Sequence, residues 1–181
     1  MPSSGLPTIL LVPGAFGTPA GYDPMLPYLK AAGFTTHPRP YPSLNHPEPS
    51  KATCANDIAS LRDNVIRPLT EEQQKEVVII AHSFGGIVAG GAAKGFDKQH
   101  FLSQGQNGGV IGFIYVALNI ALENAYLAET FGGVYPPFSQ VDKPSQGLVL
   151  IKPAMDVLFN DCDPAHADEL VASCNDPCLY P

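Results

Sequence analysis

The sequence predicts an α/β fold with a mostly parallel sheet and flanking helices. Short, unbroken apolar runs, such as residues 8–12 (TILLV) and 77–81 (VVIIA), are typical of strands buried on both faces of a parallel sheet. Segments with apolar residues at helical spacing lie between these runs, and this alternation favours parallel strands joined by helices. The 181 residues, of which 45% are hydrophobic, suffice for one domain with its own core and exclude disorder throughout.

The first strand, residues 8–12, is followed by a helix and a second strand. Asp23 is a favourable N-cap, Pro24 suits the first helical position, and Gly33 is a natural stop. We therefore expect a helix that begins at Pro24 and ends before Gly33, and then a short strand at residues 34–37.

A proline-rich loop and a second helix come next. Five prolines lie between residues 38 and 49, so this segment is expected to be an extended loop. Helical spacing of apolar residues resumes after Thr53, and Pro68 is expected to end that helix. The charged residues 71–76 are then expected to form a solvated connector with no role beyond solubility.

Three further segments complete the predicted core, which we assign to residues 1–118. Residues 77–81 are the most strand-like segment, because they are short, unbroken and rich in β-branched side chains. An Ala- and Gly-rich helix is expected at residues 87–94, and another apolar strand at residues 110–118.

The pattern loosens in residues 119–181, which we assign to a second region. It contains one apolar run, residues 148–151, and one expected helix, residues 164–172, with Asp163 as its cap. Residues 175–181 are expected to be an unstructured end.

Composition excludes several classes of partner. The net charge is −7 and the chain has no block of Lys or Arg, so nucleic acid and acidic membrane surfaces are not expected partners. No apolar stretch approaches the roughly 18 residues of a membrane span, and no secretory signal is recognisable, which makes the cytoplasm the default location.

Four cysteines are present, and none belongs to a recognisable metal-binding pattern. Without a signal peptide, free thiols are the default, and a late disulfide within the tail is the alternative. We expect neither a metal nor a cofactor. The cysteines are Cys54, Cys162, Cys174 and Cys178.

The segment Ala81-His82-Ser83-Phe84-Gly85 is a close variant of the G-x-S-x-G motif. The positions two before and two after the serine need small residues, because a sharp strand-to-helix turn crowds them, and Ala81 meets that need. Such a turn lifts the serine hydroxyl above the sheet edge and places it at a helix N-terminus, where negative charge is favoured. The alternative is a helix-capping serine in an unrelated α/β protein.

The loop after the first strand, residues 13–17 (PGAFG), lies where loops line the ligand crevice of an open α/β sheet. A backbone N–H from this loop, together with the N–H of Phe84, would form an oxyanion hole. The simpler alternative is that the two glycines only shape the turn.

Three segments together resemble the α/β-hydrolase fold family (AB hydrolase-1 type), and are similar to its small-ester methylesterase and hydroxynitrile lyase relatives. The resemblance covers about residues 7–172 and implies a partial α/β-hydrolase fold, with an incomplete cap in residues 119–181. The segments are TILLVPGAFGTPAGYDPMLPYLKAAGF, EVVIIAHSFGGIVA and GVIGFIYVALNIAL.

The resemblance implies a serine hydrolase that acts on small, largely apolar esters or acyl compounds, with a small molecule as its partner. Ser83 is then the catalytic nucleophile, and Ala15 and Phe84 donate the oxyanion-hole N–H groups. Phe16 and His82 are the implied substrate-binding residues. The proline-rich loop, the loop carrying Phe16 and the cap-like region are expected to wall the pocket.

The catalytic acid and histidine of this family follow the serine along the chain, and neither is assigned here. His100 and His166 are expected at the surface, and His82 is a poor candidate for the base because neighbours on a strand point to opposite faces. The chain is thus expected to stop before those two partners, which leaves three functions open: a hydrolase, a lyase with the same need for a histidine, or a degenerate, non-catalytic binding protein. The strand at residues 110–118 is expected at an exposed sheet edge, a site for self-association.

Overall fold

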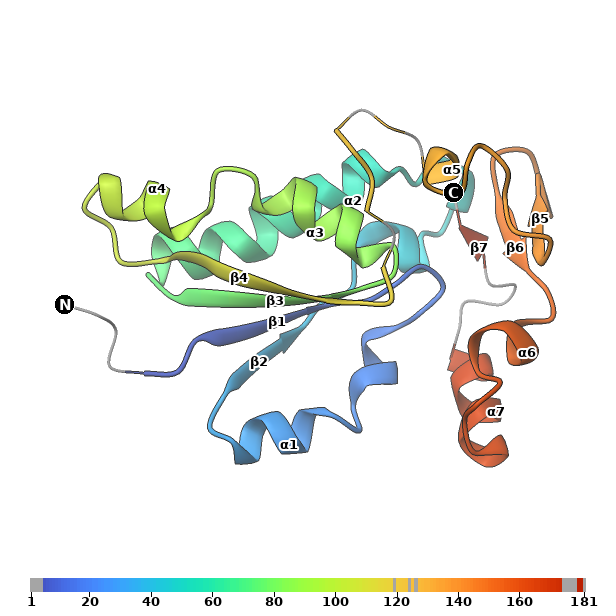
Figure 1. Ribbon diagram of the computed structural model, residues 1–181, viewed down its shortest axis with the longest axis horizontal. Coiled ribbons are helices and arrows are strands. Elements are labelled where there is room, and N and C mark those ends of the chain that lie inside the picture. The colour runs from blue at the N-terminus through green and yellow to red at the C-terminus, as the bar shows by residue number, and fades with distance from the viewer. Residues whose placement is uncertain (1–4, 119, 124, 126, 174–178, 181) are drawn as a thin grey trace.

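A four-stranded parallel sheet forms the centre of the computed structural model, which describes residues 5–118, 120–123, 125, 127–173 and 179–180 (Figure 1). The strand order is β2-β1-β3-β4, and all three neighbouring pairs are parallel, as the sequence predicts. Parallel pairing places the carboxyl ends of the strands at one edge of the sheet. The strands are β1 (Thr8–Val12), β2 (Thr35–Pro38), β3 (Glu76–His82) and β4 (Gly109–Val116).

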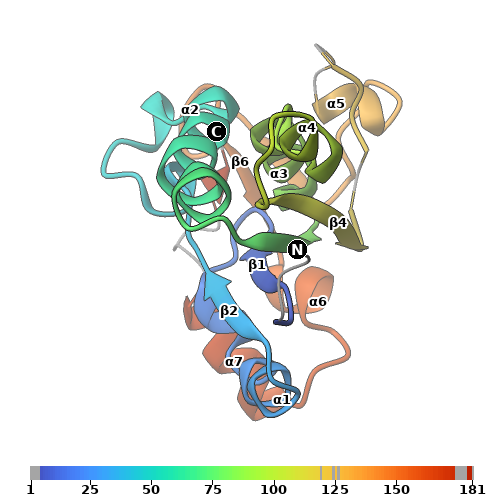
Figure 2. The same cartoon turned by 90° about the vertical axis from the view of Figure 1, so that its left-hand side faces the viewer.

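Helices cover both faces of this sheet. Helices α2 (Cys54–Leu61), α3 (Gly85–Ala93) and α4 (Lys98–Ser103) lie on one face, and α1 (Leu26–Ala31) lies on the other (Figure 2). The largest part of the core lies between the sheet and α2 and α3. Its fully buried side chains include Leu10, Val12, Leu61, Ile66, Val77, Ile79, Ala81, Val88, Ala89 and Ala92.

The first helix begins later than expected. A 3-10 turn, Pro19–Tyr22, comes first, and the Asp23 N–H donates to the Ala20 carbonyl at 3.0 Å. Asp23 therefore closes this turn instead of capping α1, which begins at Leu26. The expected stop is confirmed, because Gly33 adopts a φ of 90° immediately after the helix.

The expectation that Pro68 ends the second helix was wrong. The expected start is confirmed, since Thr53 Oγ1 accepts the Asn56 N–H at 3.1 Å. Past α2 the chain continues through two π-helical turns, Arg62–Ile66 and Pro68–Glu72. A proline ring clashes with the carbonyl four residues earlier in an α-helix, and the wider π turn relieves that contact.

The residues expected to form only a solvated connector contribute to the fold. Glu71 lies in the second π turn and pairs with Arg67 at 3.0 Å. Glu76 begins β3 and pairs with Lys98 at the start of α4, at 2.9 Å. The second pair joins the central strand to a helix that the sequence analysis did not predict.

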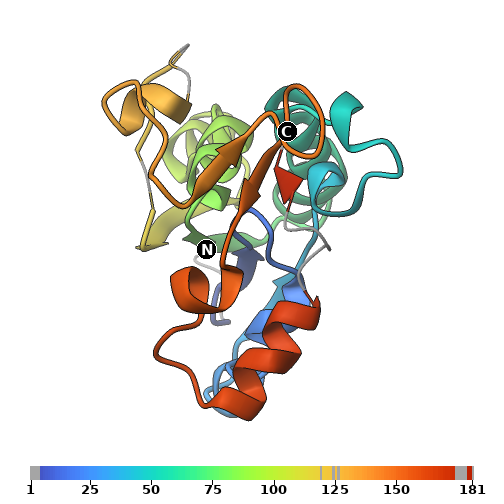
Figure 3. The ribbon, with the colours of Figure 1, turned by 90° about the vertical axis from the view of Figure 1, so that its right-hand side faces the viewer.

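Residues after β4 form a small antiparallel sheet and short helices, more structure than the sequence indicates (Figure 3). The strands are β5 (Ser139–Val141), β6 (Val149–Ile151) and β7 (Leu179–Tyr180), and the helices are α5 (Leu127–Thr130), α6 (Ala154–Leu158) and α7 (Pro164–Ser173). The expected cap of α7 is confirmed, because Asp163 Oδ1 accepts the Ala165 N–H at 3.1 Å. The tail was wrongly expected to be unstructured, because Leu179–Tyr180 pairs with β6; residues 174–178 and 181 lie outside the described residues.

Cys54 and Cys162 are free thiols, as expected, while Cys174 and Cys178 lie outside the described residues. Burial, together with nearby Asp57, raises the pKa of Cys54 to about 11, so this thiol stays protonated at neutral pH. The described residues contain no group of three or more metal-ligating side chains. Nor do they include a helix of the length and apolar character that crossing a membrane requires.

Strand β4 is the outermost strand on its side of the sheet, as expected. Ile114 and Tyr115 are each 51% exposed, and Val116 is 44% exposed. The Asp97–Val110 bridge covers only the beginning of the strand. Among the described residues, no strand pairs with the rest of β4 on its outer side, where apolar side chains are exposed.

Candidate active site

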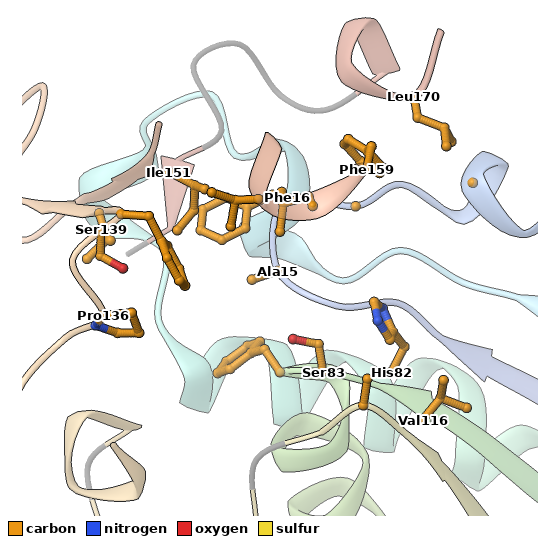
Figure 4. Close-up of a pocket in the computed structure, with 18 of the residues that line it drawn as sticks. Ala15, Phe16, His82, Ser83, Val116, Pro136, Ser139, Ile151, Phe159 and Leu170 are labelled. Carbon is orange, nitrogen blue, oxygen red and sulfur yellow. The ribbon is translucent and has the colours of Figure 1, made fainter. Parts of the chain in front are cut away.

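Ser83 lies at a sharp turn between β3 and α3. The strand ends at His82, α3 begins at Gly85, and Ser83 itself adopts a φ of 49°. Positive φ is uncommon for a residue with a side chain, and the turn is held because the Ser83 N–H donates to the Val116 carbonyl of β4 at 3.0 Å. The hydroxyl consequently projects beyond the sheet edge, beneath Ala15 (Figure 4).

Two glycines allow the β1 loop (residues 13–17) to approach this turn. A Cβ added at Gly85 would lie 2.2 Å from the Pro13 carbonyl oxygen, and a Cβ added at Gly14 would lie 2.9 Å from the Ser83 Cβ. Both distances are shorter than any ordinary contact. The β1 loop is therefore packed directly against the serine turn, with no room for a side chain at either glycine.

A cavity of about 720 Å³ opens above Ser83, at the carboxyl ends of β3 and β4. All five site residues that the sequence predicts, Ala15, Phe16, His82, Ser83 and Phe84, line it. Its remaining walls come largely from apolar side chains of the second region. These are Leu127, Phe131, Tyr135, Pro136, Phe138, Val149, Ile151, Val157, Leu158, Phe159 and Leu170.

The proline-rich loop does not wall the cavity, contrary to expectation. No residue between 38 and 49 lines it. Tyr41 instead contacts the β1 loop and Phe84, which form part of the site. The Tyr41 hydroxyl donates to the Pro13 carbonyl at 2.9 Å, and its ring meets the Phe84 ring edge to face at 6.2 Å between centroids. Tyr41 is buried, and burial raises the pKa of its hydroxyl well above the usual value, so the hydroxyl remains a donor.

Asp57 anchors the segment that carries Tyr41. Its buried carboxylate accepts the Ser43 N–H at 2.8 Å and the Ser43 hydroxyl at 2.6 Å. Burial raises the pKa of Asp57, and the two hydrogen bonds from Ser43 oppose that rise. The link from α2 to Ser43 thus fixes the position from which Tyr41 contacts the β1 loop.

Helix α3 presents its N-terminus to the cavity. Phe84 is its N-cap and is buried, and Phe16 in the β1 loop adopts a φ of 67°. Backbone strain at two neighbouring cavity residues, Phe16 and Ser83, is typical of functional sites. The positive end of the helix dipole favours an anion near the Ser83 hydroxyl.

His82 faces the cavity as well, so the strand alternation used against its role as a base does not hold at this position. Strand alternation ends at His82, because the positive φ of Ser83 turns the chain. His82 Nδ1 lies 2.9 Å from the Tyr22 hydroxyl, which also accepts the Gly14 N–H at 3.4 Å. Burial lowers the pKa of His82, so the ring is neutral at neutral pH.

The described residues place no histidine or acid in hydrogen-bonding contact with Ser83. His100 is exposed and lies 3.1 Å from Gln104, and His166 is exposed and 3.6 Å from Glu169. Both are surface histidines, as expected. None of the acids Asp156, Asp161 and Asp163 lines the cavity.

Sequence reasoning expected the cap-like region to wall the pocket, but it missed Tyr22 and did not identify the individual wall residues. Tyr22 ends a 3-10 turn, and its partner His82 lies 60 residues away in the chain, so no local pattern indicates the contact. The only signals for the wall were the apolar run at residues 148–151 and the helix after Asp163, which supply Val149, Ile151 and Leu170.

The strand order, the serine turn and the glycine-lined loop define a class of protein. The chain matches the alpha/beta hydrolase family over residues 9–176, which is more than half of its length. The protein belongs to the alpha/beta hydrolase family, which confirms the resemblance seen in the three sequence segments.

Among curated proteins, the chain is similar to alpha/beta hydrolase nvfD of Aspergillus novofumigatus. The two are 28% identical over 168 residues, which cover 90% of this chain and 64% of that protein. This chain therefore spans less than two thirds of the length of that relative.

Solved structures share the fold. Polyneuridine aldehyde esterase superposes with a TM-score of 0.70 and 16% identity, covering 93% of this chain and 68% of the esterase. Tomato methylketone synthase I, in complex with 2-tridecanone, superposes with a TM-score of 0.65 and 11% identity, covering 93% and 66%. At these identities the likeness concerns the fold, and function has to be argued from the site.

Proposed function

We propose that Ser83 is the nucleophile of an acyl-transfer reaction in which largely apolar esters are hydrolysed. One observation carries this proposal: a serine at a φ of 49°, between a buried strand and a helix N-terminus, opens into an apolar cavity. A helix-capping serine needs neither the strained turn nor the cavity.

The geometry suits a tetrahedral transition state. Ser83 Oγ would attack the acyl carbon while its proton passes to a base, and the ester oxygen would leave with a proton as an alcohol. Negative charge would gather on the carbonyl oxygen, where the N–H groups of Ala15 and Phe84 and the N-terminus of α3 favour it. Water would then release the acyl group from Ser83.

The cavity indicates the class of substrate. Its volume of about 720 Å³ lies within the range of roughly 300–1,000 Å³ that small-molecule sites occupy. Aromatic and aliphatic side chains dominate its walls, so a bulky apolar acyl or alcohol group fits better than a charged one. The esterase among the structures of like fold is consistent with ester chemistry.

Labelling by a fluorophosphonate probe tests the nucleophile, because such probes bond covalently to an activated serine. The wild-type chain is expected to be labelled, and Ser83→Ala is expected to lose the label. Ser139→Ala is the matched control, since Ser139 lines the same cavity but lies on β5, outside the strained turn. Absence of labelling in the wild type, or its survival in Ser83→Ala, would remove Ser83 from this role.

A second candidate function is non-catalytic binding of a small apolar ligand. It is favoured by the lack, among the described residues, of a histidine bonded to Ser83. This function predicts that apolar esters raise the melting temperature without being consumed and without labelling of Ser83 by the probe. Turnover that depends on Ser83 would exclude it.

A further inference from the structure

Tyr22 connects the β1 loop to the end of β3, and both segments line the proposed active site. Its hydroxyl lies 3.4 Å from the Gly14 nitrogen in the β1 loop and 2.9 Å from His82 Nδ1 at the end of β3 (Figure 4 shows His82 beside Ser83). The two rings also meet edge to face, at 6.1 Å between centroids. Neither the resemblance nor the motif assigns a role to Tyr22.

The proton on this contact can be placed by counting donors. The Gly14 N–H can only donate, so the Tyr22 oxygen accepts from it. Among the described residues, the acceptor at hydrogen-bonding distance from the Tyr22 hydroxyl proton is His82 Nδ1. This arrangement favours donation from the Tyr22 hydroxyl to Nδ1, with the proton of a neutral His82 ring on Nε2.

The second ring nitrogen, Nε2, remains available to a ligand. Within the described part of the chain Nε2 makes no hydrogen bond. It is also not fully buried, because Thr18 Oγ1 is the one fully buried side-chain N or O atom there that lacks a partner. Because His82 lines the cavity beside Ser83, an N–H at this position is a donor in an otherwise largely apolar wall. A donor in such surroundings favours ligands that offer an oxygen acceptor.

We propose that Tyr22 is a positioning residue that holds His82 as the Nε2–H tautomer, and that this N–H binds a second oxygen acceptor of the substrate beside Ser83. This inference rests on the proposed function and narrows its substrate class. The expected substrate is an apolar ester that carries a further carbonyl or ether oxygen near its acyl group.

The same proton placement bears on the choice of base. A nitrogen that carries a proton cannot take another from Ser83, and Nδ1 is already occupied by the Tyr22 hydroxyl. His82 thus serves as a donor to the substrate in this arrangement and cannot act as the base for Ser83.

The test follows the His82 ring by ¹⁵N NMR in the Ser83→Ala chain, in which no ester is consumed. His82→Gln identifies the resonances of His82 by their disappearance. A neutral ring protonated on Nε2 is expected, and adding Tyr22→Phe is expected to release the ring to a mixture of both tautomers. Tyr135→Phe is the matched control, because Tyr135 lines the cavity but, among the described residues, forms neither a hydrogen bond nor a ring contact with His82, and it should leave the tautomer unchanged.

Recognition is tested with two probes that differ by one carbonyl group, methyl acetoacetate and methyl butyrate. The keto ester is expected to shift the Nε2 resonance and to bind about five- to tenfold more tightly than the simple ester, the gain from one neutral hydrogen bond. Tyr22→Phe should reduce that preference, and His82→Phe should abolish it, whereas His82→Gln, which keeps an N–H donor, should retain part of it.

Each outcome decides between the alternatives. A His82 ring protonated on Nδ1, or a tautomer that Tyr22→Phe does not change, would overturn the positioning role. Equal affinity for the two esters would overturn the recognition role. None of these measurements requires turnover, so failure of the proposed hydrolase activity would appear separately, as absence of probe labelling at Ser83.

Discussion

Gly85→Ala tests the close approach of the β1 loop to the serine turn. The added methyl group would lie 2.2 Å from the Pro13 carbonyl oxygen and 2.6 Å from that of Val12, whereas ordinary contacts begin at 3.4 Å. Both atoms belong to the backbone, which cannot rotate away as a flexible side chain would. The β1 loop must therefore move by roughly an ångström relative to α3.

The expected cost follows from two opposing effects. Overpacking costs about 1–3 kcal/mol, and a clash with backbone belongs at the upper end of that range. Alanine also gains about 1 kcal/mol over glycine within a helix, which leaves a net loss of about 2 kcal/mol. Gly90→Ala is the matched control in α3, because nothing lies within 4 Å of its added methyl group, and it should gain about 1 kcal/mol.

Thermal unfolding of the two variants measures this difference. For a chain of this size, 1 kcal/mol corresponds to about 2–4 °C, so Gly85→Ala should melt roughly 6–12 °C below Gly90→Ala. Displacement of the β1 loop should also slow probe labelling of Ser83 by about 100-fold. Equal melting temperatures and equal labelling rates in both variants would refute the argument that the loop and the turn are in tight contact.

Two further predictions concern Asp57 and strand β4. Burial raises the pKa of Asp57, so this carboxyl stabilises the fold below about pH 4, its unfolded value, and that contribution is lost as the pH rises through the higher folded value. The melting temperature of Asp57→Asn minus that of the wild type should therefore increase from about pH 4 to about pH 7, and a constant difference would contradict this. Ile114→Lys, on exposed β4, should abolish any concentration-dependent association in sedimentation velocity; a wild type that stays monomeric at about 100 µM would count against an interface at this edge.

Strands β1 and β3 could be predicted because their burial, complete in β1 and alternating with half-buried residues in β3, leaves an apolar run in the sequence. Residues 8–12 and 77–81 are unbroken apolar runs, and both lie in strands of the sheet. The antiparallel sheet left only a partial trace, the apolar run at residues 148–151 that contains β6. Its strands are two or three residues long, and β5 reads Ser-Gln-Val, which is too short to show a period of two.

Pro68 shows a different limit of sequence reasoning. The rule that proline ends a helix assumes α-helical hydrogen bonding, and the chain avoids the clash by changing to π-helical turns. Leu69 and Thr70 within the second π turn are buried, and the Thr70 hydroxyl donates to the Ile66 carbonyl at 2.8 Å. Tertiary packing therefore outweighs the local preference at this position.

Features around Ser83 that lie within one continuous segment could be predicted, whereas contacts between distant residues could not. The motif at residues 81–85 and the glycines of the β1 loop lie in continuous segments, and both meet at the cavity. The contact of Tyr22 with His82 and that of Tyr41 with Pro13 join residues 60 and 28 positions apart. Such contacts depend on how strands and turns pack, which no local pattern encodes.

Two parts of the chain contribute differently to the site. The turn at Ser83, the β1 loop and the tyrosines that support them all belong to residues 5–118, where a parallel sheet and buried hydrogen bonds fix their positions. Most of the apolar wall belongs to residues 127–170, which are joined by short helices and a small sheet. Substitutions in the second part can reshape the cavity without disturbing the strained turn, because the turn is held by β4, Gly14 and Gly85. The shape of the cavity can therefore change through the wall while the geometry around Ser83 stays the same.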